Sequence, residues 1–209
     1  MKKDYSLYLV TDRACIGKRN LTLYEAVERA ILGGCSMVQL RETDINSLNF
    51  YETAKEMKQL TDRYDIPLII NNRADIALAV RAAGVHIGQR DIPAYPVRKL
   101  IGKDTILGVS VTSVSEALRA EADGADYLGV GAMLPTKTKR DAKIVPAEEL
   151  CAIRRAVRIP IVVIGGIRKE NAAEFLRMGA DGVAVVSAIL EQEDIRRAAE
   201  ELRRECGGG

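Results

Sequence analysis

The chain has 209 residues, 47% of them hydrophobic, which is enough apolar material for one sizeable core without requiring a second domain. Its 31 basic and 29 acidic side chains leave a formal net charge of only +2, and it has no tryptophan and two phenylalanines. This balance argues against nucleic acid as a main partner, because neither a basic surface nor aromatic stacking platforms are indicated.

Neither a secretory signal nor a membrane span is predicted. Asp12 interrupts the first apolar run before it reaches signal length, and no later run approaches the ~20 apolar residues that a span needs. The four cysteines are far apart and form no CxxC pair, which is typical of reduced thiols. We therefore expect a cytoplasmic protein with no membrane partner.

Short apolar, β-branched runs recur along the chain and predict eight buried strands. Their near-continuous apolar character is typical of parallel strands that are covered on both faces. The predicted strands are residues 6–11, 36–40, 67–70, 84–87, 105–109, 125–130, 160–164 and 182–186.

Helical patterns occupy the intervals between these strands. Thr22 with Glu25, and Ser113 with Glu116, have the spacing of capping boxes, and Pro146 suits a first helical turn. The predicted helices are residues 23–32, 46–64, 73–81, 93–101, a segment after Ser113, and residues 146–157, 169–178 and 191–206.

A glycine-containing phrase recurs where a helix is expected to end and a strand to begin, at residues 33–36, 83–85, 123–126 and 178–181. Glycine takes the left-handed conformation that ends a helix without a Cβ penalty. Eight strands, each followed by a helix, predict an α/β fold consisting of a single (β/α)₈ TIM barrel over residues 1–206. Residues 207–209 are glycines and are expected to form a flexible tail. A doubly wound open sheet is the alternative fold.

The loop after the sixth predicted strand has the composition of a phosphate site. Residues 136–140 read Thr-Lys-Thr-Lys-Arg, and Pro135 stiffens the entry to the loop. Hydroxyls and backbone amides make short contacts to phosphate, while the cations supply charge. A solvated basic turn is the simpler interpretation of this loop taken alone.

The other strand ends also carry polar or glycine residues, which a barrel brings to one rim. Glycines after the seventh strand and a small hydroxyl after the eighth match the place where barrels commonly bind phosphate on backbone amides. Together these positions predict a site for an anionic, multiply phosphorylated ligand. They are Thr11 and Asp12, Gln39 and Arg41, Asn71 and Asn72, Gln89 and Asp91, Ser110, the loop 136–140, Gly165 and Gly166, and Ser187.

Eight phrases in this chain resemble thiamine-phosphate synthase, and they occur in that family's order over nearly the whole length. The most specific is Pro-Thr-Lys-Thr-Lys at residues 135–139, whereas the glycine phrases are shared with many phosphate-binding barrels. The other phrases are residues 8–12, 38–42, 70–78, 84–89, 108–110, 164–167 and 182–187.

The resemblance implies a reaction that joins hydroxymethylpyrimidine diphosphate to thiazole phosphate, or to its carboxylated form. The products would be thiamine phosphate and pyrophosphate, and Mg²⁺ would be the cofactor. By position, Arg41, Ser110 and Lys139 would be the catalytic residues, and Asn72 and Asp91 the metal ligands. The substrate-binding residues implied in the same way are Gln39, Leu40, Arg41, Glu42, Thr43, Asn71, Ser110, Thr136, Lys137, Thr138, Lys139, Gly166, Val186 and Ser187. The resemblance implies that the pyrimidine diphosphate would be held by Gln39, Arg41, Asn71, Ser110 and Lys139. Thr136 and Thr138 would contact the thiazole side, and the thiazole phosphate would be bound by Gly166, Val186 and Ser187.

Such a transfer needs no protein nucleophile. Breaking the carbon–oxygen bond builds negative charge on the leaving diphosphate and positive charge on the pyrimidine methylene, which the thiazole nitrogen attacks. The enzyme positions the substrates and neutralises the departing charge, with Mg²⁺ held by one or two carboxylates and phosphate oxygens. His86, the only histidine, lies in an apolar run and is expected to be a satisfied structural residue.

Two positions depart from the family pattern. The family usually has an aspartate where this chain has Asn72, so a carboxylate metal ligand becomes an amide. It usually has a lysine where this chain has Thr43, which removes a cation near the diphosphate. Both changes affect the binding of one ligand, the magnesium complex of the diphosphate.

Three other functions are considered. A thiazole tautomerase would use the same barrel without a metal, but that relative has a histidine where this chain has Thr112, and it lacks the intact basic loop. A non-catalytic binding protein or regulator would still bind the phosphate ligand but would not catalyse a reaction. Another phosphate-sugar isomerase of the barrel class would need a paired acid and base at the rim. In each case the expected partners are small molecules, and a homo-oligomer is compatible with the sequence.

Overall fold

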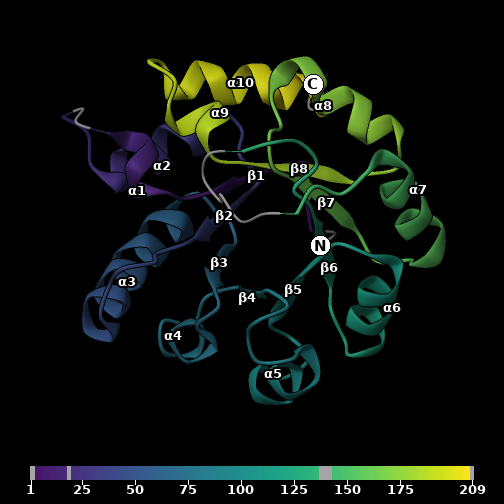
Figure 1. Ribbon diagram of the computed structural model, residues 1–209. Coiled ribbons are helices and arrows are strands. Elements are labelled where there is room, and N and C mark those ends of the chain that lie inside the picture. The colour runs from purple at the N-terminus through teal and green to yellow at the C-terminus, as the bar shows by residue number, and fades with distance from the viewer. Residues whose placement is uncertain (1–2, 18–19, 137–142, 208–209) are drawn as a thin grey trace.

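Eight parallel strands close into a barrel in the computed structural model, which describes residues 3–17, 20–136 and 143–207 (Figure 1). The order around the barrel follows the chain, and β8 pairs back with β1. The strands are β1 (Leu7–Val10), β2 (Met37–Leu40), β3 (Leu68–Asn71), β4 (Gly84–Ile87), β5 (Ile106–Val111), β6 (Tyr127–Val130), β7 (Ile161–Ile164) and β8 (Gly182–Val185). The predicted barrel is confirmed, and the open doubly wound sheet is excluded because the sheet has closed.

Helices form an outer ring around the strands (Figure 1). They are α1 (Arg13–Ile16), α2 (Leu23–Leu32), α3 (Ser47–Arg63), α4 (Ala74–Ala79), α5 (Ala94–Ile101), α6 (Val114–Ala122), α7 (Ala147–Ala156), α8 (Lys169–Arg177), α9 (Ser187–Leu190) and α10 (Ile195–Glu205). The short helices α1 and α9 were not predicted. The last predicted helix, residues 191–206, begins four residues later than expected, with Asp194 as its cap.

The predicted helix caps are largely confirmed. Thr22 and Glu25 form a reciprocal capping box at α2, in which the Thr22 N–H donates to the Glu25 carboxylate over 2.7 Å. Ser113 caps α6 by accepting from the Glu116 N–H, but the Glu116 carboxylate accepts from the Thr112 N–H over 2.6 Å. The second capping box is therefore replaced by a single cap and a bond to the preceding residue.

The glycine phrases behave as predicted at three helix ends and differ at the fourth. Gly34, Gly124 and Gly179 have φ angles of 100°, 93° and 104°. At the end of α4 the left-handed residue is Arg81, with φ 54°, and Gly84 is already part of β4. Gly84 is needed there for space, because a Cβ would overlap the backbone and side chain of Ile106 on β5.

Two apolar cores lie on opposite sides of the barrel wall. The larger fills the space between strands and helices, and it contains Leu9, Val38 and Leu40. The smaller fills the barrel interior and is built around Tyr8 and Tyr127. Because side chains alternate along a strand, a residue next to one that packs in the larger, outer core faces the barrel interior. This alternation decides which strand residues can reach a site inside the barrel.

Three further predictions concern the chain as a whole. Among the described residues, no helix combines the length and the apolar character needed to cross a bilayer. The four cysteines are free thiols. Gly207 is exposed, and the other two glycines of the predicted tail lie outside the described residues.

Candidate functional site

A cavity of about 510 Å³ opens inside the barrel, and residues of all eight strands line it. It brings together residues from four strand ends and one loop, which lie far apart in the sequence. The predicted site residues that line this barrel cavity are Gln39, Arg41, Asn71, Asn72, Asp91, Ser110 and Thr136. These residues are the ones that the sequence assigned to the pyrimidine diphosphate, the metal and one contact on the thiazole side.

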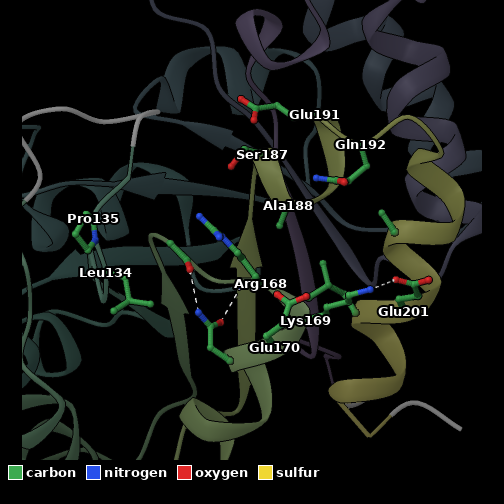
Figure 2. Close-up of a pocket in the computed structure, with 14 residues that line it drawn as sticks. Leu134, Pro135, Arg168, Lys169, Glu170, Ser187, Ala188, Glu191, Gln192 and Glu201 are labelled. Atoms are coloured by element: carbon green, nitrogen blue, oxygen red, sulfur yellow. Dashed lines mark hydrogen bonds and ion pairs between the residues drawn. The ribbon is translucent and has the colours of Figure 1, made fainter.

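A second cavity of about 850 Å³ lies beside α8, α9 and α10 (Figure 2). Gly166 and Ser187, both predicted to hold the thiazole phosphate, line it. Figure 2 shows Leu134 and Pro135 on one side of this helix-side cavity, and Ser187 and Gln192 on another. The two cavities adjoin, because Gly165 and Thr136 line the first while their neighbours Gly166 and Pro135 line the second.

The turn after β7 is fixed in the helix-side cavity by one side chain. The Asn171 amide nitrogen donates to the Gly166 carbonyl over 3.1 Å, and its oxygen accepts from the Arg168 N–H over 2.8 Å. Gly165 and Gly166 have φ angles of 93° and 71°, which only glycine adopts without strain. A Cβ on Gly166 would lie 2.5 Å from the Leu134 Cβ, so this turn packs directly against the loop after β6.

Three cations line the barrel cavity, and two of them were not predicted. Arg41 is joined there by Arg90 and Lys143. Thr11 accepts from the Arg41 N–H over 3.0 Å, and the Arg41 guanidinium lies 3.7 Å from the Asp12 carboxylate. The signal for Arg90 was its place between two rim residues, and the signal for Lys143 was its place after the basic loop.

Two of the cavity residues could contribute ligands to a hard cation. Asp91 accepts from the Gly88 N–H over 2.7 Å, and Asn72 has φ 63° with its N–H bonded to the His86 carbonyl at 2.8 Å. In the part of the chain that the structure describes, no group of three His, Cys, Asp or Glu residues could hold a metal by itself. One carboxylate and one amide oxygen fit Mg²⁺ where phosphate oxygens and water complete its shell.

A chain of hydrogen bonds crosses the floor of the barrel cavity. The Gln39 amide nitrogen donates to the Tyr8 hydroxyl over 3.0 Å, and the Tyr8 and Tyr127 hydroxyls lie 2.9 Å apart. The Tyr127 hydroxyl is 2.9 Å from His86 Nδ1, and His86 Nε2 is 2.8 Å from the Ser110 hydroxyl. His86 is buried and satisfied, as predicted, but its partner Ser110 faces the cavity. Tyr8 and Tyr127 were missed as cavity residues, although strand alternation places Tyr8 with Val10 and Tyr127 with Gly129.

Several predicted substrate-binding residues line neither cavity. The Leu40 side chain packs in the core outside the barrel wall, so only its backbone can approach a ligand. Glu42 accepts from the Arg13 guanidinium at 2.7 Å, with only 8% of its side chain exposed. Thr43 is exposed and its hydroxyl is directed to Asp44 at 3.4 Å. Val186 is half-buried at the start of α9.

The three central residues of the basic loop, Lys137, Thr138 and Lys139, lie outside the described residues. Their neighbours are placed at the two cavities, with Pro135 at the helix-side cavity and Thr136 and Lys143 at the barrel cavity. The predicted roles of the three residues therefore stay predictions.

Similarity to known proteins extends over nearly the whole chain. A sequence model of the thiamine monophosphate synthase family matches residues 7–189, a stretch that contains every strand of the barrel. The chain is 61% identical to the thiamine-phosphate synthase of Clostridium beijerinckii over 98% of this chain and 97% of that protein. It is 55% identical to the thiamine-phosphate synthase of Clostridium tetani over 95% and 94% of the two chains. Among solved structures, thiamine phosphate pyrophosphorylase from Pyrococcus furiosus has a TM-score of 0.89 and 41% identity, over 98% of this chain and 96% of that one.

Proposed function

The chain belongs to the thiamine-phosphate synthase family, and we propose that its two cavities bind the two substrates of that reaction separately. The barrel cavity takes hydroxymethylpyrimidine diphosphate. The helix-side cavity takes the phosphate of the thiazole phosphate, or of its carboxylated form. The observation that carries this proposal is that two adjoining cavities contain different sets of rim residues.

The barrel cavity supplies what a departing diphosphate requires. The carbon–oxygen bond of the pyrimidine methylene breaks and its electron pair leaves with pyrophosphate, while the lone pair of the thiazole nitrogen forms the new carbon–nitrogen bond. With the carboxylated thiazole, the carboxyl group is also lost, as carbon dioxide. Arg41, Arg90 and Lys143 line the cavity in which this negative charge develops. Fixed cations in a confined site stabilise developing charge without reorganisation, so no protein nucleophile is required.

Mg²⁺ is proposed as the cofactor, held by Asp91 and the Asn72 side-chain oxygen together with the diphosphate. When bound, it would supply further neutralisation of the leaving group. With a single carboxylate at this position, more of the metal shell must come from the substrate. Thr43 does not line either cavity. The positive charge of the lysine that the family pattern has at this position would be supplied instead by Arg90 and Lys143, which line the barrel cavity.

The helix-side cavity is proposed to hold the thiazole phosphate on main-chain groups and a hydroxyl. Gly166 and Ser187 line it, and the glycine allows the backbone to approach a phosphate closely. Arg168 contributes a cation, while Lys169 is paired with Glu201 at 2.7 Å (Figure 2). Since Gly165 and Gly166 line different cavities, the thiazole ring would bridge from one to the other.

The tautomerase alternative is disfavoured by the chemistry of one position. Thr112 lines the barrel cavity, and both its N–H and its hydroxyl donate to the Glu116 carboxylate, at 2.6 Å and 3.0 Å. It therefore offers no proton-transfer group of the kind a histidine would supply. A cytoplasmic location is proposed with the synthase function, in keeping with four free thiols.

The test is incubation with both substrates, with and without Mg²⁺, followed by mass detection of thiamine phosphate and measurement of pyrophosphate. Metal-dependent formation of both products in equal amounts is the expected result. Calorimetric binding of the pyrimidine diphosphate without product would make the chain a non-catalytic relative. Isomerisation of a thiazole in the absence of the diphosphate would make it a tautomerase.

A further inference from the structure

We propose that Tyr8, Tyr127 and His86 are positioning residues that set the direction of the hydrogen bonds which Gln39 and Ser110 offer to the pyrimidine ring. The identity of the ligand rests on the proposed function, whereas the direction of the hydrogen bonds does not. The starting observation is the unbroken chain of four bonds, 2.8–3.0 Å long, from Gln39 on β2 to Ser110 on β5.

The direction follows from counting protons along the chain. The Gln39 amide nitrogen can only donate, so the Tyr8 oxygen accepts in that bond, and we assign the single Tyr8 proton to the Tyr127 oxygen, the other partner of the Tyr8 hydroxyl in the chain. With that assignment, Tyr127 donates its own proton to His86 Nδ1, which is then the acceptor nitrogen. In the neutral imidazole the remaining proton is on Nε2, and it is donated to the Ser110 oxygen.

The consequence lies at the two ends of the chain, which both line the barrel cavity. Ser110 accepts from His86, so its own hydroxyl proton is left to donate to a ligand. Gln39 has its amide nitrogen turned to Tyr8, so its carbonyl oxygen is left to accept. The cavity thus presents an acceptor on β2 and a donor on β5. An aminopyrimidine matches this pattern, because its amino group and the ring nitrogen para to it lie at opposite ends of the ring.

The barrel wall is built to accommodate the chain. A Cβ at Gly108 on β5 would overlap the Tyr127 phenol, and a Cβ at Gly129 on β6 would lie 3.0 Å from His86 Cε1. Two interior positions therefore carry no side chain, so that these two rings fit between the strands. Burial raises the pKa of both Tyr8 and Tyr127, which keeps both phenols protonated and able to donate.

The presence of a single histidine allows a direct spectroscopic test. The nitrogen chemical shifts of ¹⁵N-histidine-labelled full-length protein distinguish a ring protonated at Nε2 from one protonated at Nδ1, without substrate. The wild-type protein is expected to show only the Nε2–H form. An Nδ1–H form or a doubly protonated ring would overturn the proposal, whatever the variants do.

Three substitutions that keep each aromatic ring separate positioning from packing. Tyr127→Phe removes the donor to Nδ1, so the ring should lose its preference for the Nε2–H form. Tyr8→Phe leaves the bond from Tyr127 to His86 in place, so the tautomer should be retained. Tyr5→Phe is the matched control, because Tyr5 packs on Tyr127 with ring centroids 5.2 Å apart but is not a member of the chain. An unchanged tautomer in Tyr127→Phe would contradict the proposal.

Kinetics supply the functional half of the test. In Tyr127→Phe, kcat/KM for the pyrimidine diphosphate should fall about tenfold, equivalent to about 1.4 kcal/mol, while KM for the thiazole phosphate stays unchanged. An equal effect on both substrates would show that the chain only supports the barrel. If the wild-type protein shows the Nε2–H form but forms no thiamine phosphate, the hydrogen-bond direction stands and the proposed function fails.

Discussion

Gly166→Ala tests the assignment of the two cavities most directly. Gly166 has φ 71°, where an alanine loses roughly 1–2 kcal/mol relative to its preferred conformations. Its new Cβ would lie 2.5 Å from the Leu134 Cβ and 3.2 Å from the Pro135 carbonyl oxygen. Carbon atoms normally approach to about 3.5–4.0 Å, so the turn after β7 and the loop after β6 must separate by roughly 1 Å. A displacement of this size at a binding site can reduce catalysis about 10²-fold.

The expected result is a loss of 10-fold to 100-fold, as an order of magnitude, in kcat/KM for the thiazole phosphate. KM for the pyrimidine diphosphate should change little, because Gly166 lines only the helix-side cavity. The assay is steady-state kinetics with each substrate varied in turn at saturation of the other. Gly102→Ala is the control, since Gly102 has φ 73° and nothing lies within 4 Å of the position that its Cβ would take. Equal losses for both substrates in Gly166→Ala would refute the division into two subsites.

Three further predictions concern the metal, the β7 turn and acid stability. Asn72→Asp should lower the half-saturating Mg²⁺ concentration by adding a carboxylate, whereas Asp91→Asn should abolish most activity; a magnesium titration of the rate checks both, and an unchanged titration in Asn72→Asp would remove that residue from the metal shell. Asn171→Ala should raise KM for the thiazole phosphate severalfold and leave the pyrimidine diphosphate unaffected, because two bonds that hold the turn are lost; equal kinetics in variant and wild type would show that the turn holds its shape alone. Burial opposes ionisation of Asp4, but hydrogen bonds from Arg203 and Ser6 lower its pKa from 3.8 to about 2, so its contribution to stability is complete above about pH 4 and lost as the pH falls towards 2. Denaturant unfolding between pH 2 and 5 should therefore show a shallower loss of stability in Asp4→Asn than in the wild type, and parallel curves would contradict this.

The sequence by itself determined the architecture and the rim. Eight apolar runs, each followed by a helical pattern, were sufficient for the barrel, and Thr22 and Ser113 mark helix starts that the structure confirms. These signals are readable because they are local: capping, glycine conformation and apolar periodicity act within a few residues. The carboxyl ends of parallel strands meet by topology, so the polar residues at those ends could be grouped without coordinates.

Strand alternation was present in the sequence and could have been applied more fully. Gln39 and Arg41 have the same parity and face the cavity, while Leu40 between them faces the helices. The same rule places Tyr8 inside the barrel. The register of neighbouring strands, by contrast, cannot be read from the sequence of one strand. The pairing of His86 with Gly108, and of Ser110 with Gly129, brings the His86 ring and the Ser110 hydroxyl together.

Only the tertiary structure decided how the rim residues are divided. Gly165 and Gly166 are adjacent in the chain, yet they line different cavities because their positive φ angles turn the backbone between them. Arg90 and Lys143 reach the barrel cavity from the loops after β4 and β6, and no local sequence signal fixes where a loop side chain is directed. The hydrogen-bond chain from Gln39 to Ser110 joins five strands, and it exists only because the closed barrel places side chains separated by up to 119 positions within 3 Å of one another.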